Sequence, residues 1–125
     1  MEKKILVVDD ELDDRKKMVT ALEKEGYSVM EAASAEETLL KAGETIPHMV
    51  IVDVLMPGTT GFDLCRQIKE KFRPHPPLVL MVTGKAAAVN VSLAHQMGAD
   101  GFEAKTTGMP FVVKAVRALF SRDSR

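Results

Sequence analysis

Residues 5–10 read ILVVDD, so four apolar residues are followed immediately by two aspartates. The apolar part is short and continuous, as in strands of a parallel sheet that are covered on both faces. The end of such a strand is an unfavourable place for two adjacent carboxylates, because they repel each other and apolar surroundings disfavour both charges. The doublet therefore raises the question of what compensates it at the end of this strand.

Other segments of the chain have the same strand-like character. Continuous apolar runs rich in Val, Ile and Leu occur at residues 49–52 and 78–82, and weaker strand candidates lie at residues 28–30 and 102–104. Segments with helical spacing of apolar residues follow each strand; they cover residues 11–25, 34–43, 62–72, 86–97 and 111–120. This fivefold alternation predicts βαβ crossovers, a parallel sheet and helices on both of its faces.

Residues typical of helix ends support these assignments. Ser34 is a predicted N-cap, and Glu37 three residues later completes a capping box. Gly43 and Gly98 are expected to terminate the second and fourth helices. Pro110 precedes the last helix, where proline is well accommodated.

In the first helix, apolar residues recur at intervals of three, four and seven; they are Leu12, Met18, Val19 and Leu22. Asp13 and Asp14 are expected to belong to this helix as first-turn acids favoured by its dipole, or to a solvated face. Cys65 falls on the apolar side of the third helix and is expected in the core.

Length and composition narrow the class of protein. A chain of 125 residues suits one domain with one core; we expect residues 1–121 to form it and residues 122–125 to be a short polar tail without an output domain. The 17 basic and 18 acidic residues leave a net charge of −1, which offers no general electrostatic reason to bind nucleic acid or an anionic membrane. No apolar run approaches a membrane span, and the N-terminus lacks signal-peptide character. The single cysteine excludes an internal disulfide and a cysteine metal site, so a cytoplasmic location is expected.

Polar residues follow four of the predicted strands. Asp9 and Asp10 end the first, Asp53 the third, Thr83 the fourth and Lys105 the fifth. Because open α/β sheets bind ligands outside the carboxyl ends of their strands, these side chains are expected to share one site.

Three aspartates in one site need a cation, or some of them must protonate. Lys105 offsets one charge, and Mg²⁺ characteristically takes one or two protein carboxylates together with waters and a phosphate oxygen. A carboxylate can also act as a nucleophile and form an aspartyl-phosphate. The set therefore suits phosphoryl transfer, with a divalent cation on one side, Lys105 on the other, and the Thr83 hydroxyl as a donor to a phosphoryl oxygen.

Four stretches, ILVVDD, VIVDVLMPGTTGFDL, LVLMVTGK and GADGFEAK, closely resemble the receiver domain of two-component response regulators. The resemblance extends over essentially the whole chain, with the motifs in the family's order and spacing. It implies a flavodoxin-like doubly wound (βα)5 fold, with a five-stranded parallel sheet in the order 2-1-3-4-5.

The resemblance also implies roles for individual residues. Asp53 resembles the phosphoacceptor and a ligand of Mg²⁺ (or Mn²⁺). Asp10 resembles the direct metal ligand and Asp9 the acid that holds the metal through water, while the backbone carbonyl of Leu55 completes the coordination. Lys105 resembles the lysine that pairs with the phosphoryl group.

Four further positions correspond to the switch and to the control of hydrolysis. Thr83 resembles the switch hydroxyl and Phe102 the aromatic rotamer switch. Leu55 and Lys85 occupy the positions that tune hydrolysis of the phosphoryl group. An apolar Leu55 does little to orient an attacking water, so we expect a fairly long-lived aspartyl-phosphate.

The chain departs from the family pattern after Lys105. Most receivers have a proline directly after this lysine, often in a cis peptide, whereas here residues 106–110 read TTGMP. We therefore expect a longer loop, which affects both the backbone geometry at Lys105 and the start of the last helix. The turn after Asp53, including Met56-Pro57-Gly58 and Gly61, resembles the family's, where backbone passes close to the site.

The function implied is that of a signalling phosphoacceptor, not an enzyme on external substrates; it assists only its own phosphorylation and dephosphorylation. The expected donor is the phosphohistidine of a histidine kinase or phosphotransfer protein. The resemblance implies that a downstream protein, or a second copy of the chain, binds the face formed by residues 86–97, the fifth strand and the last helix, through which the family commonly signals. Residues 86–97 carry no formal charge, which is typical of a partner interface. No direct contact with nucleic acid or membrane is expected.

Two alternatives remain open on the sequence. One is an interaction module of the same fold that works without phosphorylation; the complete set of site residues argues against it. The other, less favoured, is an aspartate-based phosphohydrolase, which would need a second acid to activate water and a substrate pocket. Neither feature is visible in the sequence.

Overall fold

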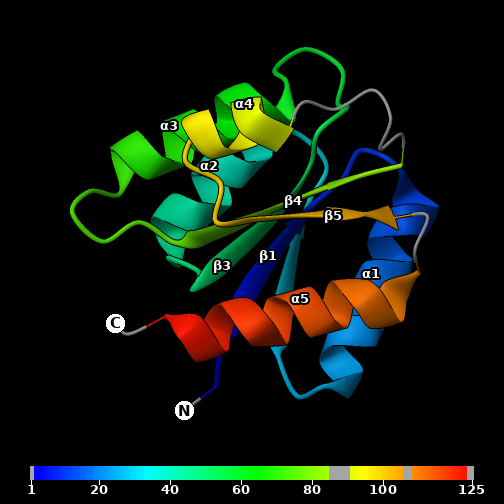
Figure 1. The fold of residues 1–125 in the computed structure, drawn as a ribbon. Helices are drawn as coiled ribbons and strands as arrows, with labels where there is room; N and C mark the ends of the chain where they lie inside the picture. Colours follow the sequence, from blue (N-terminus) through cyan, green and yellow to red (C-terminus); the bar gives the residue numbers. More distant parts are fainter. Residues whose placement is uncertain (1, 85–90, 106–107, 124–125) are drawn as a thin grey trace.

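The computed structural model describes residues 2–84, 91–105 and 108–123. Strands and helices alternate along these residues (Figure 1). The strands are β1 (Lys4–Val8), β2 (Ser28–Ala32), β3 (Met49–Asp53), β4 (Leu78–Thr83) and β5 (Gly101–Ala104). The helices are α1 (Leu12–Lys24), α2 (Ala35–Glu44), α3 (Gly61–Lys71), α4 (Val91–Gln96) and α5 (Met109–Arg122).

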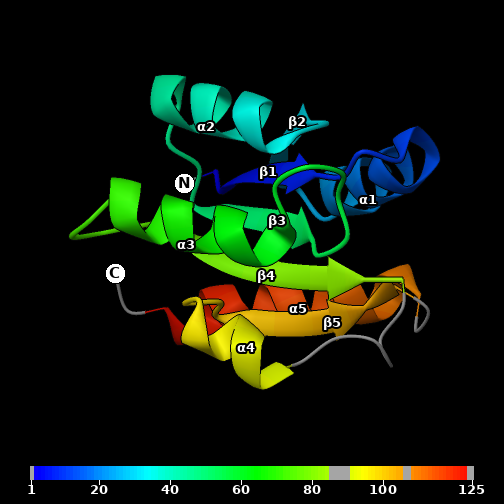
Figure 2. The same cartoon turned by 90° about the horizontal axis from the view of Figure 1, so that it is seen from above.

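The strands form one parallel sheet in the order β2-β1-β3-β4-β5 (Figure 2), which confirms the predicted flavodoxin-like fold. The chain runs from β1 to β2 on one side and then returns to β3 on the other side of β1. Such a reversal is a topological switch point, and it opens a crevice at the carboxyl ends of β1 and β3. Val8 lies beside Val52 in the register, so Asp9 and Asp53 emerge next to each other at this crevice.

Both faces of the sheet are covered, as the continuous apolar strands predict. Helices α1 and α5 lie on one face, and α2, α3 and α4 on the other (Figure 1). Alternate residues of each strand enter the two cores: Ile5 and Val7 pack toward α1 and α5, whereas Leu6 and Val8 pack toward α2–α4. The strands are thus held between two apolar layers, and their polar ends mark the place where this covering stops.

The helix ends agree with the sequence in part. Ser34 caps α2, since its Oγ accepts a hydrogen bond from the Glu37 N–H at 3.1 Å, while Glu37 Oε1 accepts from the N–H of Ala33, one residue before the expected partner. Gly98 follows α4 with φ +96°, the left-handed conformation predicted for it. The prediction that Gly43 ends α2 is wrong, because the helix continues to Glu44. A glycine costs a helix interior only about 1 kcal/mol, and Thr38 and Ala42 remain buried along this helix.

Leu12 is 55% exposed although its spacing matches that of Met18 and Leu22, which are buried. It is the first residue of α1, which begins beyond the carboxyl end of β1, where no sheet lies beneath it to be covered. Cys65 is buried in the α2–α4 core as predicted, and burial raises the pKa of its thiol to about 11.

The last two helices differ in extent from the prediction. The described part of α4 covers Val91–Gln96, and residues 86–90 of the predicted helix lie outside the described residues. Helix α5 begins at Met109, with Pro110 in its first turn, and continues to Arg122, one residue beyond the domain boundary expected from the sequence. Across the ranges that the structure describes, no helix combines the length and apolarity that crossing a membrane requires.

Candidate functional site

Three aspartates converge at the crevice between β1 and β3. Asp9 and Asp10 follow β1, Asp53 is the last residue of β3, and each offers a carboxylate oxygen within 4.8 Å of the others. Asp9 and Asp53 are buried, with 1% and 7% exposure, whereas Asp10 is exposed. The sequence prediction that these residues meet is confirmed; their individual roles remain predictions.

The carboxylate of Asp53 is held from two sides. The Leu55 N–H donates to Oδ1 at 3.2 Å, and the Lys105 ammonium group lies 3.4 Å from Oδ2. The backbone amide orients one oxygen, and the lysine neutralises the other. This arrangement leaves a fixed carboxylate at the rim of the sheet, as a nucleophile requires.

The chain after β3 folds back against the acceptor strand. The Gly61 N–H donates to the Val54 carbonyl at 3.0 Å, and a Cβ on Gly61 would lie 2.5 Å from the backbone oxygen of Asp53. Only glycine allows so close an approach. The adjacent Thr60 caps α3, since its Oγ1 accepts from the Asp63 N–H at 3.2 Å. The structure thus confirms that backbone passes close to the site at Gly61.

Lys105 follows the edge strand β5, and its side chain reaches the carboxylates at the ends of β1 and β3. Its Nζ lies 2.5 Å from Asp9 Oδ2, 3.2 Å from Asp14 Oδ2 and 3.4 Å from Asp53 Oδ2, and its side chain is 12% exposed. The predicted meeting of Lys105 with Asp9 and Asp53 is confirmed. The contact between Lys105 and Asp14 was not predicted from the sequence.

Burial and neighbouring charge shift the protonation equilibria of the site. Burial raises the pKa of Asp53 from 3.8 to about 6; the Lys105 charge opposes this increase and the Asp9 charge adds to it. For Lys105, burial alone would lower the pKa, but its hydrogen bond to Asp9 and the negative charges of Asp53 and Asp9 outweigh burial and raise it. Lys105 is therefore a cation at neutral pH, and burial disfavours the charged form of Asp53.

The sequence analysis assigned Asp14 to the helix and missed its part in the site. Asp14 does belong to the first turn of α1, but its carboxylate also reaches Lys105. No sequence pattern marked this contact, because Asp10 precedes α1 and the contact depends on where α1 lies relative to the end of β5. Asp13, the other acid of this turn, remains a first-turn helix residue.

The two residues expected to act as the switch lie on neighbouring strands, β4 and β5. Thr83 ends β4 and is fully buried, and the ring of Phe102 in β5 is partly buried against the α2–α4 core. Leu55 is 52% exposed beside Asp53. Lys85 and the peptide that joins Lys105 to Thr106 fall outside the described residues, so the expected effect of the TTGMP loop on that peptide stays a prediction.

The donors of this site are chemically uniform. Asp9, Asp10 and Asp53 provide carboxylate oxygens, the ligand type that hard divalent cations prefer. An open, doubly wound α/β domain with three aspartates and a lysine at the carboxyl ends of its strands defines the class: a flavodoxin-like domain with an acidic site at the carboxyl edge of its sheet.

Comparison with known proteins identifies the family within this class. Residues 5–117 match the model of the response regulator receiver domain, and the chain belongs to this family. Of solved structures, the response regulator receiver domain protein (CheY-like) from Methanospirillum hungatei JF-1 superimposes with a TM-score of 0.85 at 30% identity, covering 97% of this chain and 96% of that one.

Longer proteins with this domain are also similar. The chain is 37% identical over 124 residues to the transcriptional regulatory protein ResD of Bacillus subtilis, covering 99% of this chain and 50% of that protein. It is 34% identical over 122 residues to the alkaline phosphatase synthesis transcriptional regulatory protein PhoP of the same organism, covering 98% of this chain and 50% of that protein. The chain thus spans about half the length of these relatives.

Proposed function

We propose that this receiver domain accepts a phosphoryl group on Asp53 and works as a phosphorylation-controlled switch in a two-component system. The observation that carries the proposal is the placement of Asp53: a buried carboxylate with Lys105 at 3.4 Å and two further acids within ligand distance of a common point. Phosphoryl transfer depends mainly on positioning and charge neutralisation, and this site supplies both.

In the proposed reaction, a carboxylate oxygen of Asp53 attacks the phosphorus of a phosphohistidine on a partner histidine kinase or phosphotransfer protein. The new O–P bond forms as the P–N bond breaks, and the departing imidazole nitrogen keeps the bonding electron pair. Lys105 already faces Asp53 Oδ2 and would pair with the transferred group. Thr83 would donate to another phosphoryl oxygen.

Asp10 and Asp53 are the proposed direct ligands of Mg²⁺, together with the Leu55 carbonyl, and Asp9 acts through water. When bound, Mg²⁺ would supply charge neutralisation at the phosphoryl oxygens. The three carboxylates fit such an ion because Lys105 alone cannot balance their charge.

The proposed output is a change of the face formed by α4, β5 and α5. Inward movement of Thr83 would let Phe102 bury its ring, which biases this face between two states. Phe102 is already partly buried there, and the exposed described residues of α4 carry no formal charge. A downstream protein or a second copy of the chain would read the change.

Mass spectrometry tests the proposal directly. The chain is incubated with acetyl phosphate and Mg²⁺, and the native chain is compared with Asp53→Asn. We expect one phosphoryl group on the native chain, none on Asp53→Asn, and strong reduction when EDTA replaces Mg²⁺. Asp63→Asn is the matched control, because it removes the first-turn acid of α3 and leaves Asp53 unchanged.

Absence of label on the native chain would overturn the proposal and favour an interaction module that works without phosphorylation. Steady release of phosphate from an added phosphate ester would instead favour a phosphohydrolase.

A further inference from the structure

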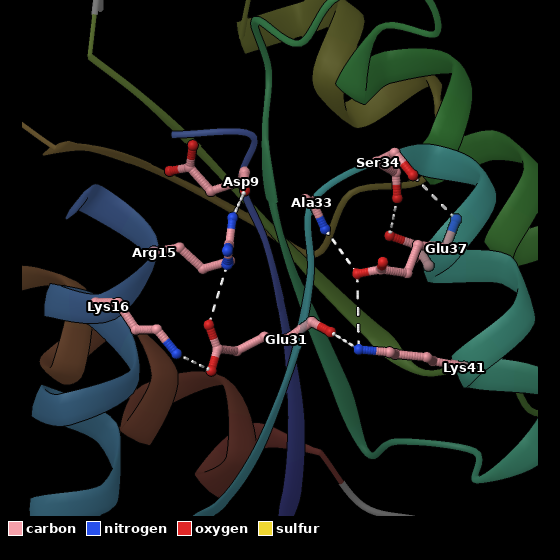
Figure 3. Close-up of polar contacts among 9 residues, drawn as sticks. Asp9, Arg15, Lys16, Glu31, Ala33, Ser34, Glu37 and Lys41 are labelled. Atoms are coloured by element: carbon pink, nitrogen blue, oxygen red, sulfur yellow. Dashed lines mark hydrogen bonds and ion pairs between the residues drawn. The ribbon is translucent and has the colours of Figure 1, made fainter. Parts of the chain in front are cut away.

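A second polar network lies behind the acidic crevice, where α1 faces β2 (Figure 3). The Arg15 guanidinium donates from Nη1 to the backbone carbonyl of Asp9 at 2.8 Å and from Nε to Glu31 Oε1 at 3.0 Å. Its side chain is only 14% exposed. Arg15 thus spans from the end of β1 to β2 and occupies a defined position.

The bond to the Asp9 carbonyl constrains more than Asp9. That carbonyl belongs to the planar peptide that joins Asp9 to Asp10, so fixing its oxygen also fixes the Cα of Asp10. On the other side, the Asp9 N–H donates to the Ala32 carbonyl at 3.1 Å. Both peptide groups of Asp9 are therefore held by hydrogen bonds, while its carboxylate turns away from Arg15 (Figure 3) and contacts Lys105.

Glu31 holds the guanidinium in turn. Its Oε2 accepts from Lys16 at 2.8 Å, and its backbone carbonyl accepts from Lys41 of α2. The hydrogen bonds from Lys16 and from Arg15 lower the pKa of Glu31, so it stays a carboxylate at neutral pH. Glu31 also neutralises Arg15, which limits repulsion between the guanidinium and a cation in the crevice.

We propose that Arg15 is a positioning residue of the metal site: it fixes the Asp9–Asp10 peptide, and Glu31 orients its guanidinium. The inference rests on the proposed function, because it assumes that Asp9 and Asp10 hold the cation. Residues that orient metal ligands typically contribute about 10-fold or more to metal affinity.

Lys16 provides a matched control. It lies next to Arg15 on α1, is also a cation and pairs with the same carboxylate, but it donates its hydrogen bond to Glu31, whereas Arg15 also donates to the Asp9 carbonyl. Its side chain is 59% exposed. Loss of Lys16 therefore removes a charge and an ion pair without removing the bond to Asp9.

The test is a Mg²⁺ titration of the whole chain, in which the shifts of the amide NMR signals report binding. Urea unfolding confirms that each variant is folded. We expect Arg15→Met to weaken Mg²⁺ binding about 10-fold, and Lys16→Met to change it by less than about threefold, as for a weak surface ion pair. Arg15→Lys keeps the charge but cannot bond Asp9 and Glu31 with the geometry of a planar fork, so it should also bind more weakly than Lys16→Met. This second variant serves if Arg15→Met does not fold.

A double-mutant cycle tests the route through Glu31. Glu31→Gln should weaken Mg²⁺ binding in the native background and have no further effect when Arg15 is already Met or Lys. An equal effect in both backgrounds would overturn the role given to Glu31. Arg15 variants that bind Mg²⁺ as tightly as Lys16→Met would overturn the inference while leaving the proposed function intact. A native chain that binds no Mg²⁺ would overturn both.

Discussion

Lys105 Nζ lies 2.5 Å from Asp9 Oδ2, although 96 residues separate the two in sequence. The lysine follows β5 and the aspartate follows β1, and two strands, β3 and β4, lie between them in the sheet. The same ammonium group lies 3.4 Å from Asp53 Oδ2. Because Asp9 is 1% exposed and the lysine side chain 12%, water screens the pair little.

The charge on Asp53 should make the metal-free protein less stable as pH rises. The pKa of Asp53 is 3.8 ordinarily and about 6 in the folded protein. Between these values the unfolded chain has released the proton and the folded chain still holds it, so the free energy of unfolding falls as pH increases. Between pH 4 and pH 7 the free energy of unfolding should fall by about 2 kcal/mol.

Urea unfolding of the native chain and Asp53→Asn in EDTA, from pH 4 to pH 7, measures this effect. The variant should gain stability relative to the native chain as pH rises. Glu31 has the opposite effect on the pH dependence of stability, since its pKa is lowered and its contribution to stability is lost at acidic pH. This effect is present in both the native chain and Asp53→Asn, so it cancels in the difference between them. A difference that stays constant across this range contradicts the prediction.

Removing Lys105 should raise the pKa of Asp53 above about 6, because the lysine charge is what opposes burial at this carboxyl group. Carbon-13 NMR titration of the Asp53 carboxyl group in metal-free Lys105→Met measures the shift. Lys69→Met is the control: Lys69 pairs with Asp100 at 2.6 Å and is not among the causes of the Asp53 shift. An unchanged Asp53 titration in Lys105→Met would show that the lysine does not act on this carboxyl group in solution.

Gly61→Ala should destabilise the domain by about 1–3 kcal/mol, the usual cost of overpacking. Its Cβ would meet the Asp53 carbonyl oxygen at 2.5 Å, and the backbone of β3 would have to shift. Gly43→Ala, in the exposed end of α2, should instead stabilise by about 0.5–1 kcal/mol, since its Cβ would meet only the end of Lys71 at 4.0 Å. Urea unfolding of both variants checks the opposite signs; equal effects would mean that the contact at Gly61 relaxes at no cost.

Leu55→Asn should shorten the lifetime of the proposed aspartyl-phosphate. Leu55 is exposed beside Asp53 and offers no polar group to an attacking water. An amide there could orient water and accelerate hydrolysis about 10-fold, less than the roughly 100-fold of a well-placed acid or base. Loss of phosphoryl label after removal of the donor measures the rate, with Leu55→Met as the apolar control. Loss within seconds from the native chain would contradict the long lifetime expected.

Apolar runs and helical spacing in the sequence were sufficient to predict the strands and helices of the fold. The runs at Ile5–Val8 and Met49–Val52 are continuous because both faces of these strands are covered, and apolar continuity is visible without coordinates. The prediction that Gly43 ends the helix was wrong because a glycine ends a helix only where the chain turns. Packing along α2 stabilises the helix beyond Gly43.

The sequence by itself determined the buried parallel sheet and the acids at its carboxyl edge, because strand burial and strand ends follow from the order of residues along the chain. It did not determine that Asp14 reaches Lys105, or that Arg15 holds the Asp9 carbonyl. Those contacts depend on how α1 sits against β2 and how far Lys105 extends across the sheet. A hydrogen bond requires a donor and an acceptor within about 3 Å, and only the packed tertiary structure brings side chains from separate elements to that distance.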